Sequence, residues 1–591
     1  MFQCRSSIVL PSLIVFCVIS VPLCLCASSS KAHRSPIDIA LLPGGHGLTA
    51  NHTADTVSLV DLEIGKLLDE VKCGQKPSAV ACSRDGTRAA VSNLWSGTVS
   101  LFLVQKSSLQ PCGEIAVGPL PRGIIFSADG MTLYVAVSDE VVRCGWKAKK
   151  VMHRMPAPRE PRCLALSPDG SRLAAASSRS ATVYCWDAKT GKSQWQREIE
   201  DGFNLRGLAF TPDGKALVCA HAIHRSFPVS RENIEKGWVI DSRLTLLPID
   251  PNAKPSIEQI ALDTFGKAVG DPHGLAYTAD SRRLAVAAAG THELLVLESD
   301  HIPWTGGEPG DLIDDTLIHG EHRMHRIPLG GRPMTVVPIG GSKLAVANYL
   351  LDAVQIVDAE AGKVIRSIPL GSPARSSLAR RGEELFYDAT RSHNQWFSCH
   401  TCHTEGHTCG LTFDTLNDDS YGNPKLTPTL RNVTKTGPWT WHGWQKDLGA
   451  AVKKSLTETM FGPEPTDEET KAMLAFLGTL DHPPNPKSPS DASKRGEVLF
   501  RGKANCIRCH NGEYFTSAGL YDVGLESDGS PYRLWNPPSL RGVWDRGPFL
   551  HDGRAPTLDA VLRKHHAPEK LGGSPLTGEE RKDLIAFLRS L

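Results

Sequence analysis

The 591-residue sequence has almost no net charge, since 65 lysines and arginines are balanced by 64 aspartates and glutamates. Nothing in that balance indicates a nucleic-acid partner or a charged membrane surface. Hydrophobic residues make up 40% of the chain and charged residues 22%, which excludes an intrinsically disordered protein. At about 100 to 200 residues per domain, the length predicts several domains rather than one.

Methionine is scarce, with eight in the chain and none after residue 510, whereas there are 16 cysteines. Four of the cysteines form two matching motifs, CHTCH at Cys399–His403 and CIRCH at Cys506–His510. This is the spacing of covalent c-type haem attachment, in which both sulfurs bond the porphyrin and the imidazole binds iron. A zinc site is the alternative for the first motif, because His400, His407 and Cys409 belong to the same loop. The second motif has no such neighbours, so haem is the interpretation for both.

The two motifs predict two c-type haems, each with a histidine as its proximal iron ligand. The residues predicted to hold them are Cys399, Cys402, His403, Cys506, Cys509 and His510. Eight cysteines outside these motifs and the leading segment permit disulfides in an exported protein, but their pairing cannot be read from the sequence. Plain buried thiols are the alternative within strand-like runs.

Residues 1–28 are interpreted as a secretory signal peptide. An almost uninterrupted apolar run from Ile8 to Ala27 follows Arg5, and small residues around Ala27 give a cleavage site. A retained membrane anchor is the alternative, because the run is nearly long enough to span a bilayer. We expect a periplasmic or otherwise extracytoplasmic protein that contacts no membrane beyond an uncleaved anchor.

Residues 37–371 repeat a pattern of short strands and turns. The Asp-Gly turn signals begin at Ser83, Ser127, Ser167 and Thr211, each between two strand-like runs. A period of about 40 to 45 residues with about four strands is typical of a β-propeller blade. We count seven units, with insertions at 221–241 and 300–325. The array resembles the seven-bladed YVTN-type propellers, a likeness that is specific for fold and weak for function.

Beyond the repeats, helical periodicity replaces strand alternation, and the chain divides into two matching halves. Arg381–Phe386 corresponds to Arg495–Phe500. Each half closes with a capping box, at Thr466 and at Thr577, before an amphipathic helix.

The predicted architecture is therefore a multidomain chain, an all-β seven-bladed propeller followed by two mainly α cytochrome c-like domains. Residues 376–481 carry the first haem and residues 491–591 the second. A proline-rich linker, 482–490, joins them.

Residues 376–591 resemble the bacterial di-haem cytochrome c peroxidases and their relatives in methylamine utilisation. The likeness rests on both haem motifs, on Pro428–Val433 and Pro538–Val543, and on Phe549–Arg554. It implies a peroxidase-like oxidoreductase with electron transfer between two haems, a peroxide or small-molecule substrate, an electron-donor protein or small redox protein, and a calcium ion to which we assign no ligands. One alternative is a non-enzymatic electron carrier that docks its partner through the propeller. Another is a binding protein with haem as redox sensor.

The second axial ligands are predicted from the residues before each closing helix. Met473 falls on the apolar face of a helix, whereas Met460 precedes it and is predicted to bind the first iron, with packing as the alternative. No methionine follows the second motif, so His565, with His566 beside it, is predicted to bind the second iron.

His442 and His551 are predicted at equivalent points of the two halves, as haem-edge or catalytic groups. In the family scheme the methionine belongs to the second haem and peroxide reacts at the first. This chain departs from that scheme, because its candidate methionine follows the first motif. A second departure is that Trp441–Trp444 and Leu448–Ala451 lack the carboxylates that such enzymes often carry there. Peroxide cleavage needs an open iron and an acid–base group, a role that His442 or His551 would fill.

Overall fold

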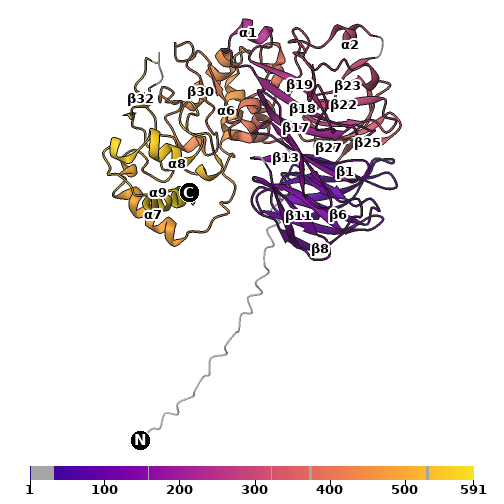
Figure 1. Ribbon diagram of the computed structural model, residues 1–591, viewed down its shortest axis with the longest axis horizontal. Coiled ribbons are helices and arrows are strands. Elements are labelled where there is room, and N and C mark those ends of the chain that lie inside the picture. Colours follow the sequence, from indigo (N-terminus) through magenta and orange to yellow (C-terminus); the bar gives the residue numbers. More distant parts are fainter. Residues whose placement is uncertain (2–31, 158, 321–322, 372–375, 527–530) are drawn as a thin grey trace.

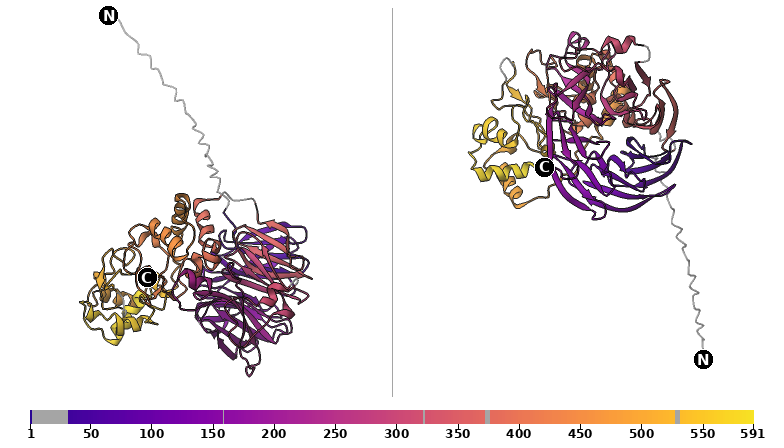
Figure 2. Two further views of the ribbon diagram at one scale, coloured as in Figure 1. Left: turned by 90° about the horizontal axis from the view of Figure 1, so that it is seen from above. Right: turned by 45° about the vertical axis from the view of Figure 1, so that its right-hand side comes forward.

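The computed structural model describes residue 1 and residues 32–591, apart from 158, 321–322, 372–375 and 527–530. The predicted signal peptide therefore lies almost entirely outside the described residues. The propeller occupies the indigo-to-magenta part of the chain, and the helical domains, orange to yellow, lie beside it (Figures 1 and 2). Among the described residues, no helix combines the length and the apolar character needed to cross a membrane.

Seven four-stranded antiparallel sheets form the blades in chain order, as predicted. The strands are β1–β4 (Pro36–Leu42, His46–Asn51, Thr56–Asp61, Lys66–Lys72), β5–β8 (Pro77–Cys82, Arg88–Asn93, Thr98–Val104, Leu109–Ala116), β9–β12 (Ile124–Phe126, Thr132–Val137, Glu140–Gly145, Lys150–Pro156), β13–β16 (Pro161–Leu166, Arg172–Ser177, Thr182–Asp187, Ser193–Glu198), β17–β20 (Gly202–Phe210, Ala216–His224, Ile240–Pro248, Glu258–Ala261), β21–β24 (Pro272–Tyr277, Arg283–Ala288, Glu293–Glu298, Met324–Pro328) and β25–β28 (Pro333–Gly340, Lys343–Asn348, Ala353–Asp358, Lys363–Pro369).

The repeated turn signals fold as expected. Asp85 Oδ1 accepts hydrogen bonds from Ser83 Oγ at 2.5 Å and from the Thr87 amide at 3.0 Å. The next residue, Gly86, has φ of +71°, a left-handed conformation that glycine adopts without steric cost. The same type of turn recurs in later blades. The spacing of the turn signals along the sequence therefore matches the spacing of the blades.

The ring of blades closes without an exchanged strand, because β1 stays in the sheet of its own blade. Thr335 Oγ1 donates to the Ile37 carbonyl at 3.3 Å, and the Ser35 amide donates to Asp352 Oδ1 at 2.7 Å. Apolar side chains of the first and seventh blades share one buried cluster. Closure is therefore made by side-chain packing and a few polar contacts.

The helical part repeats one plan twice. Its helices are α3 (Leu378–Phe386), α4 (Cys399–Cys402), α5 (Leu448–Lys454), α6 (Asp467–Leu477), α7 (Asp491–Arg501), α8 (Leu558–Ala560) and α9 (Gly578–Leu588), with short ladders β29–β30 (Thr412–Phe413, Lys425–Leu426) and β31–β32 (Tyr521–Asp522, Leu534–Trp535). In each half the first and last helices cross at a glycine. A Cβ on Gly382 would collide with the Ala472 carbonyl, and one on Gly496 with the Asp583 carbonyl. Close backbone approach explains why both halves need glycine there.

The two propeller insertions differ in what they contact. Between β18 and β19, the insertion is shorter than predicted and contains α1 (Arg231–Glu235). It packs on the first haem domain, where Glu235 Oε1 lies 2.8 Å from His393 Nε2. The second insertion contains α2 (Asp315–His319), and its Leu317 is buried against the propeller. The first insertion therefore helps to position the haem domains.

Candidate functional site: two haem cradles in one cavity

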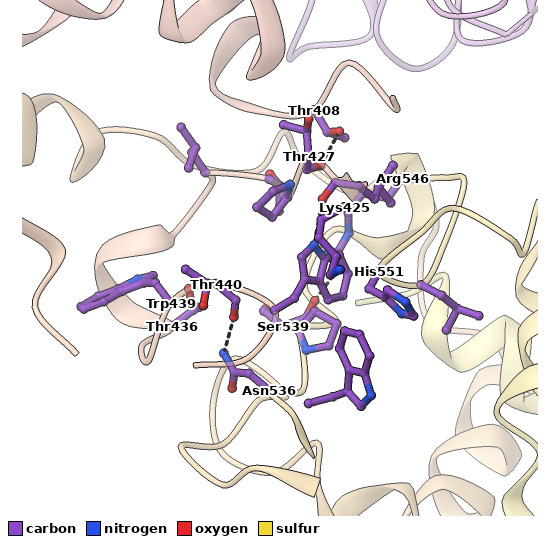
Figure 3. Close-up of a pocket in the computed structure, with 18 of the residues that line it drawn as sticks. Thr408, Lys425, Thr427, Thr436, Trp439, Thr440, Asn536, Ser539, Arg546 and His551 are labelled. Atoms are coloured by element: carbon purple, nitrogen blue, oxygen red, sulfur yellow. Dashed lines mark hydrogen bonds between the residues drawn. The ribbon is translucent and has the colours of Figure 1, made fainter. Parts of the chain in front are cut away.

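A single cavity of about 620 Å³ extends between the two helical halves, and both haem motifs contribute to its wall. The cysteines and proximal histidines lining it are Cys399, Cys402, His403, Cys506, Cys509 and His510. Around them the wall is mostly apolar, with a few polar groups such as Lys425, Asn536 and His551 (Figure 3). An apolar cavity that presents two thiols and one imidazole at each end fits two covalently attached haems.

Both proximal histidines are oriented by a backbone carbonyl. His403 Nδ1 donates to Pro428 O at 3.0 Å, and His510 Nδ1 donates to Phe515 O at 3.1 Å. Because Nδ1 carries the proton, Nε2 is left with a lone pair for iron. Burial lowers the pKa of each imidazole to about 4, so both are in the neutral, metal-binding form at pH 7.

The propeller builds part of the first haem site. Ser398 and Thr401, which directly precede Cys399 and Cys402, each donate a hydroxyl hydrogen bond to Asp271 at 2.6 Å. Asn204 Nδ2 donates to the Thr401 carbonyl at 3.1 Å. The haem-binding helix α4 is thus held by a carboxylate and an amide from two different blades.

Met460 lies in the first cradle, where the sequence placed it. It is buried, lines the cavity and lies with its Sδ 3.9 Å from Cys399 Sγ. It is the first residue after a π-helical turn, Ser455–Thr459, that continues α5. A thioether that lines the cradle is available as a ligand for an iron held by His403, and Met460 stays the predicted ligand.

For the second iron, the structure favours His566 over the predicted His565. The ring centroids of His566 and His510 are 6.5 Å apart, with planes at 74°. Two imidazoles sharing one metal at nitrogen–metal bonds of about 2 Å have centroids roughly 6 Å apart, so the gap accommodates one iron. His565 instead lines a separate surface pocket with Lys564 and Lys570.

The difference arises from helix geometry, because neighbouring residues of a helix point about 100° apart. Val561–His565 forms a π-helical turn that continues α8, and His566 is the first residue after it. Met460 holds the same position after its own turn. The two candidate ligands are therefore structurally equivalent.

His442 and His551 are not equivalent, contrary to the prediction. Thr440 and Leu550 both have φ of +72°, and a glycine with positive φ follows three residues later in each half. This alignment pairs His551 with Trp441 and His442 with Asp552. The mistake came from matching histidine to histidine rather than the Gly-Pro-aromatic segments that precede them.

An aromatic stack links the two histidines. The Trp535 ring lies 3.9 Å from His551 and 4.4 Å from His442, centroid to centroid, and Trp441 lies 6.3 Å from His551. His442 Nδ1 donates to Leu534 O at 3.0 Å. Burial lowers the pKa of both imidazoles, so both are neutral at pH 7. A neutral imidazole in this wall can accept a proton.

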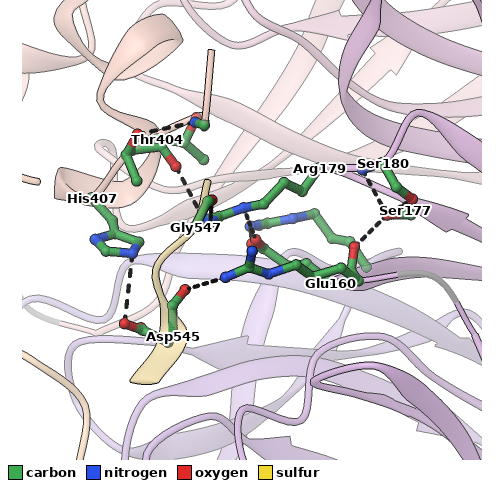
Figure 4. A network of polar contacts seen from close by, with 12 residues as sticks. Glu160, Ser177, Arg179, Ser180, Thr404, His407, Asp545 and Gly547 are labelled. Atoms are coloured by element: carbon green, nitrogen blue, oxygen red, sulfur yellow. Dashed lines mark hydrogen bonds and ion pairs between the residues drawn. The ribbon is translucent and has the colours of Figure 1, made fainter. Parts of the chain in front are cut away.

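One propeller arginine contacts both haem domains (Figure 4). Arg179 donates to the Thr408 carbonyl of the first domain at 3.2 Å and to the Gly547 carbonyl of the second at 3.1 Å. Its Nε is 3.1 Å from Glu160 Oε2, which holds the guanidinium in place. Nearby, His407 Nε2 and Asp545 Oδ1, from the two haem domains, lie 3.7 Å apart.

Sequence reasoning missed these propeller contributions from Asn204, Asp271 and Arg179. They belong to no motif, and long-range contacts alone bring them to the haem domains.

Calcium stays a prediction: the part of the chain that is described holds no group of three or more His, Cys, Asp or Glu residues arranged to bind a metal. None of the described cysteines is paired in a disulfide.

Fold and site together define a di-haem c-type protein with an N-terminal seven-bladed propeller. Residues 376–483 match the family model of the di-haem cytochrome c peroxidases. The match confirms the resemblance seen in the sequence, and a likeness to this family implies two c-type haems.

Several other proteins are similar in sequence to this chain. The chain is 27% identical over 285 residues to methylamine utilization protein MauG of Methylophilus methylotrophus, covering 38% of this chain and 84% of that protein. It is 27% identical over 293 residues to cytochrome c551 peroxidase of Nitrosomonas europaea, covering 39% and 84%. It is 26% identical over 280 residues to hydrazine synthase subunit gamma of Kuenenia stuttgartiensis, covering 37% and 79%. A solved structure of Kuenenia stuttgartiensis hydrazine synthase aligns with a TM-score of 0.50 and 27% identity, covering 55% of this chain and 96% of that chain. Cytochrome c peroxidases and MauG are enzymes, and this likeness confirms the prediction of a peroxidase-like oxidoreductase.

Proposed function

We propose that this protein is an exported di-haem oxidoreductase that reduces hydrogen peroxide or a related small molecule at its second haem. Electrons would come from a small redox protein and enter through the first haem. The observation that carries the proposal is the pairing of His566 with His510 across a 6.5 Å gap, in a cavity shared with the first haem motif.

The unequal ligand sets support this direction of electron flow. Iron held by His403 and Met460 sits at a higher potential than iron held by two imidazoles, so the first haem would store an electron. Histidine at the second iron would have to leave before peroxide could bind. Bound haem would supply one-electron transfer and, once that ligand leaves, an open coordination position.

His551 is the residue best placed to move a proton. Its neutral ring can take a proton from peroxide on a ring nitrogen and return it to the departing oxygen, so that peroxide, two electrons and two protons give two waters. Stacking on Trp535 fixes the His551 ring. Asp552 Oδ2 lies 3.8 Å from His551 Nε2, so its negative charge stabilises the imidazolium that forms when His551 takes up the proton.

The competing function is a pure electron carrier. The same geometry also supports this function, because Met460 and His566 as ligands would make both irons six-coordinate. In that case the propeller would serve mainly to dock a partner protein. Peroxide turnover separates the two functions, because a carrier with both ligands fixed reacts with neither peroxide nor carbon monoxide.

The test is steady-state peroxide reduction by the haem-loaded wild type, His551→Ala and His442→Ala. We expect His551→Ala to lose roughly 10²- to 10⁴-fold in kcat, as for a general acid–base group. His442→Ala serves as the matched buried-histidine control and should lose much less. Equal rates in all three proteins would remove His551 from the mechanism, and no turnover in wild type would favour the carrier. Metal analysis of the same preparation tests the predicted calcium.

A further inference from the structure

The inner strands of the propeller place seven equivalent residues around its central channel. Hydrogen bonds at this level join neighbouring blades: the Gly123 amide donates to Arg162 O at 3.0 Å, and Cys163 Sγ donates to Arg206 O at 2.6 Å. Blade by blade, these residues are Ile37, Ser78, Arg122, Arg162, Arg206, His273 and Met334. The third to sixth blades therefore direct four nitrogen-rich side chains to one region.

A glutamate of the first haem domain neutralises half of this region. Glu405, just after the first haem motif, lies with Oε2 2.9 Å from Arg122 Nη1 and pairs with Arg162 through Oε1. Glu160 lies within 3.0 and 3.1 Å of the same two guanidinium groups. Arg122 and Arg162 are thus each paired with two carboxylates.

Arg206 has no such partner. Its side chain is buried, with the residue 4% exposed, and neither Nη1 nor Nη2 has a hydrogen-bond acceptor among the described residues. Burial lowers the pKa of its guanidinium to about 10, which still leaves it charged at pH 7. A buried charge is normally paired, and an unpaired one indicates a water or an ion.

Next to it, two donors face each other. The Glu405 amide donates to His400 Nδ1 at 3.0 Å, so the imidazole carries its proton on Nε2. Arg332 Nη2 lies 3.2 Å from that Nε2, and arginine can only donate. Two N–H groups at this distance cannot hydrogen-bond to each other, and one acceptor shared between them would satisfy both.

The same place includes His273, whose buried Nδ1 also has no partner in the described structure. The inner strands that carry these residues are in close contact: a Cβ on Gly207, next to Arg206, would lie 2.3 Å from His273 O, and one on Gly274, next to His273, would lie 2.5 Å from Met334 O. Burial, followed by the charges of Arg206 and Arg332, lowers the pKa of both His273 and His400. The nearby carboxylate of Asp271 is already occupied by two hydroxyl donors.

We propose that a small monovalent inorganic anion, of the size of a halide or nitrite, binds in the propeller channel between Arg206, Arg332, His273 and His400. The anion would accept hydrogen bonds from both guanidinium groups and from His400 Nε2. It would offset the surplus positive charge under the first haem motif. This site is separate from the haem cavity and does not depend on the proposed peroxide chemistry.

Bromide is the probe. Crystals of the haem-loaded full chain grown in sodium bromide should show an anomalous difference peak within about 3.5 Å of the Arg206 guanidinium nitrogens. The peak should disappear in Arg206→Gln and persist in Arg197→Gln, which removes an arginine of the outer strand β16 that contacts Pro248 O. A wild-type map with water alone at this position would overturn the proposal.

Thermal unfolding gives an independent reading. Because a ligand of the folded state raises its melting temperature, bromide should raise the midpoint of the wild type above that in sodium gluconate at equal ionic strength. Arg206→Gln should lose that difference, whereas Arg197→Gln should keep it. The same bromide shift in wild type and Arg206→Gln would contradict the site. If Arg206→Gln does not fold, the wild-type anomalous map decides alone.

Discussion

At the scale of single residues, the two haem cradles differ mainly in one side chain. Met460 and His566 each follow a π-helical turn, and each lies in the cavity that contains a proximal histidine. As iron ligands, a thioether in one cradle and an imidazole in the other would give the two irons unequal potentials. The proposed functional asymmetry would then be set by equivalent positions that carry different residues.

His566→Ala should open the second iron. Removing the imidazole that faces His510 leaves one axial position without a protein ligand, so we expect a high-spin ferric signal by spin resonance and carbon monoxide binding after reduction. His565→Ala is the matched control, because that side chain lines another pocket and should leave both spectra unchanged. High-spin character in His565→Ala alone would return the ligand to the residue predicted from sequence.

Met460→His tests the first cradle. Replacing a thioether by an imidazole lowers the potential of a haem iron, so the higher of the two midpoint potentials should fall toward the lower one. Redox titration followed by optical absorption measures both. Met155→Leu, at a buried methionine of propeller strand β12 that does not line the haem cavity, is the control and should leave both potentials in place. An unchanged upper potential in Met460→His would assign Met460 to packing.

At the scale of elements, the features that sequence predicted are local. Blade turns, capping boxes and haem motifs each depend on residues within a few positions of one another, so the sequence alone is enough to identify them. Which residue after a helix faces a cavity depends on rotation about the helix axis, and no linear pattern shows that His566 lines the haem cavity while His565 lines another pocket. The Arg179 contacts join blades to haem domains over hundreds of residues, and no local pattern records them.

The capping box of α9 should contribute measurable stability. The Thr577 hydroxyl accepts from the Glu580 amide at 3.2 Å, and Glu580 Oε2 accepts from the Thr577 amide at 2.7 Å. Thr577→Ala removes the first bond, and we expect a loss of about 1 kcal/mol in unfolding free energy of the second haem domain. Thr577→Ser keeps the hydroxyl and should stay close to wild type. Equal denaturation midpoints for Ala and Ser would show that the cap contributes nothing.

At the scale of the whole molecule, the propeller acts as a frame for both haem domains. Arg179 contacts each of them, and Asp271 and Asn204 hold the first haem motif. The distance between the two haems therefore depends on blades as well as on the helical domains.

Arg179→Ala should slow electron transfer between the haems, measured by flash photolysis of the half-reduced protein, while the haem spectra stay unchanged.

Glu160 is central to this frame, and its titration makes the assembly sensitive to acid. Burial alone would raise its pKa, but Arg179, Arg122 and Arg162 outweigh burial and lower the pKa from 4.5 to about 2. Since the folded-state pKa is depressed, the stabilisation is complete above the unfolded value and is lost as pH falls from about 4.5 to about 2. The difference corresponds to roughly 3 kcal/mol at most.

Glu160→Gln should therefore melt well below wild type at pH 7, and the gap should narrow as the pH approaches 2. Differential scanning calorimetry across that range measures it. Glu140→Gln, which removes the partner of the exposed Arg154, is the control and should change the melting temperature little at any pH. Glu405 pairs with two of the same arginines, so wild type should keep some acid sensitivity that Glu160→Gln also shows. A gap between wild type and Glu160→Gln that stays constant from pH 7 to pH 2 would mean that Glu160 stabilises the frame by packing and not by charge.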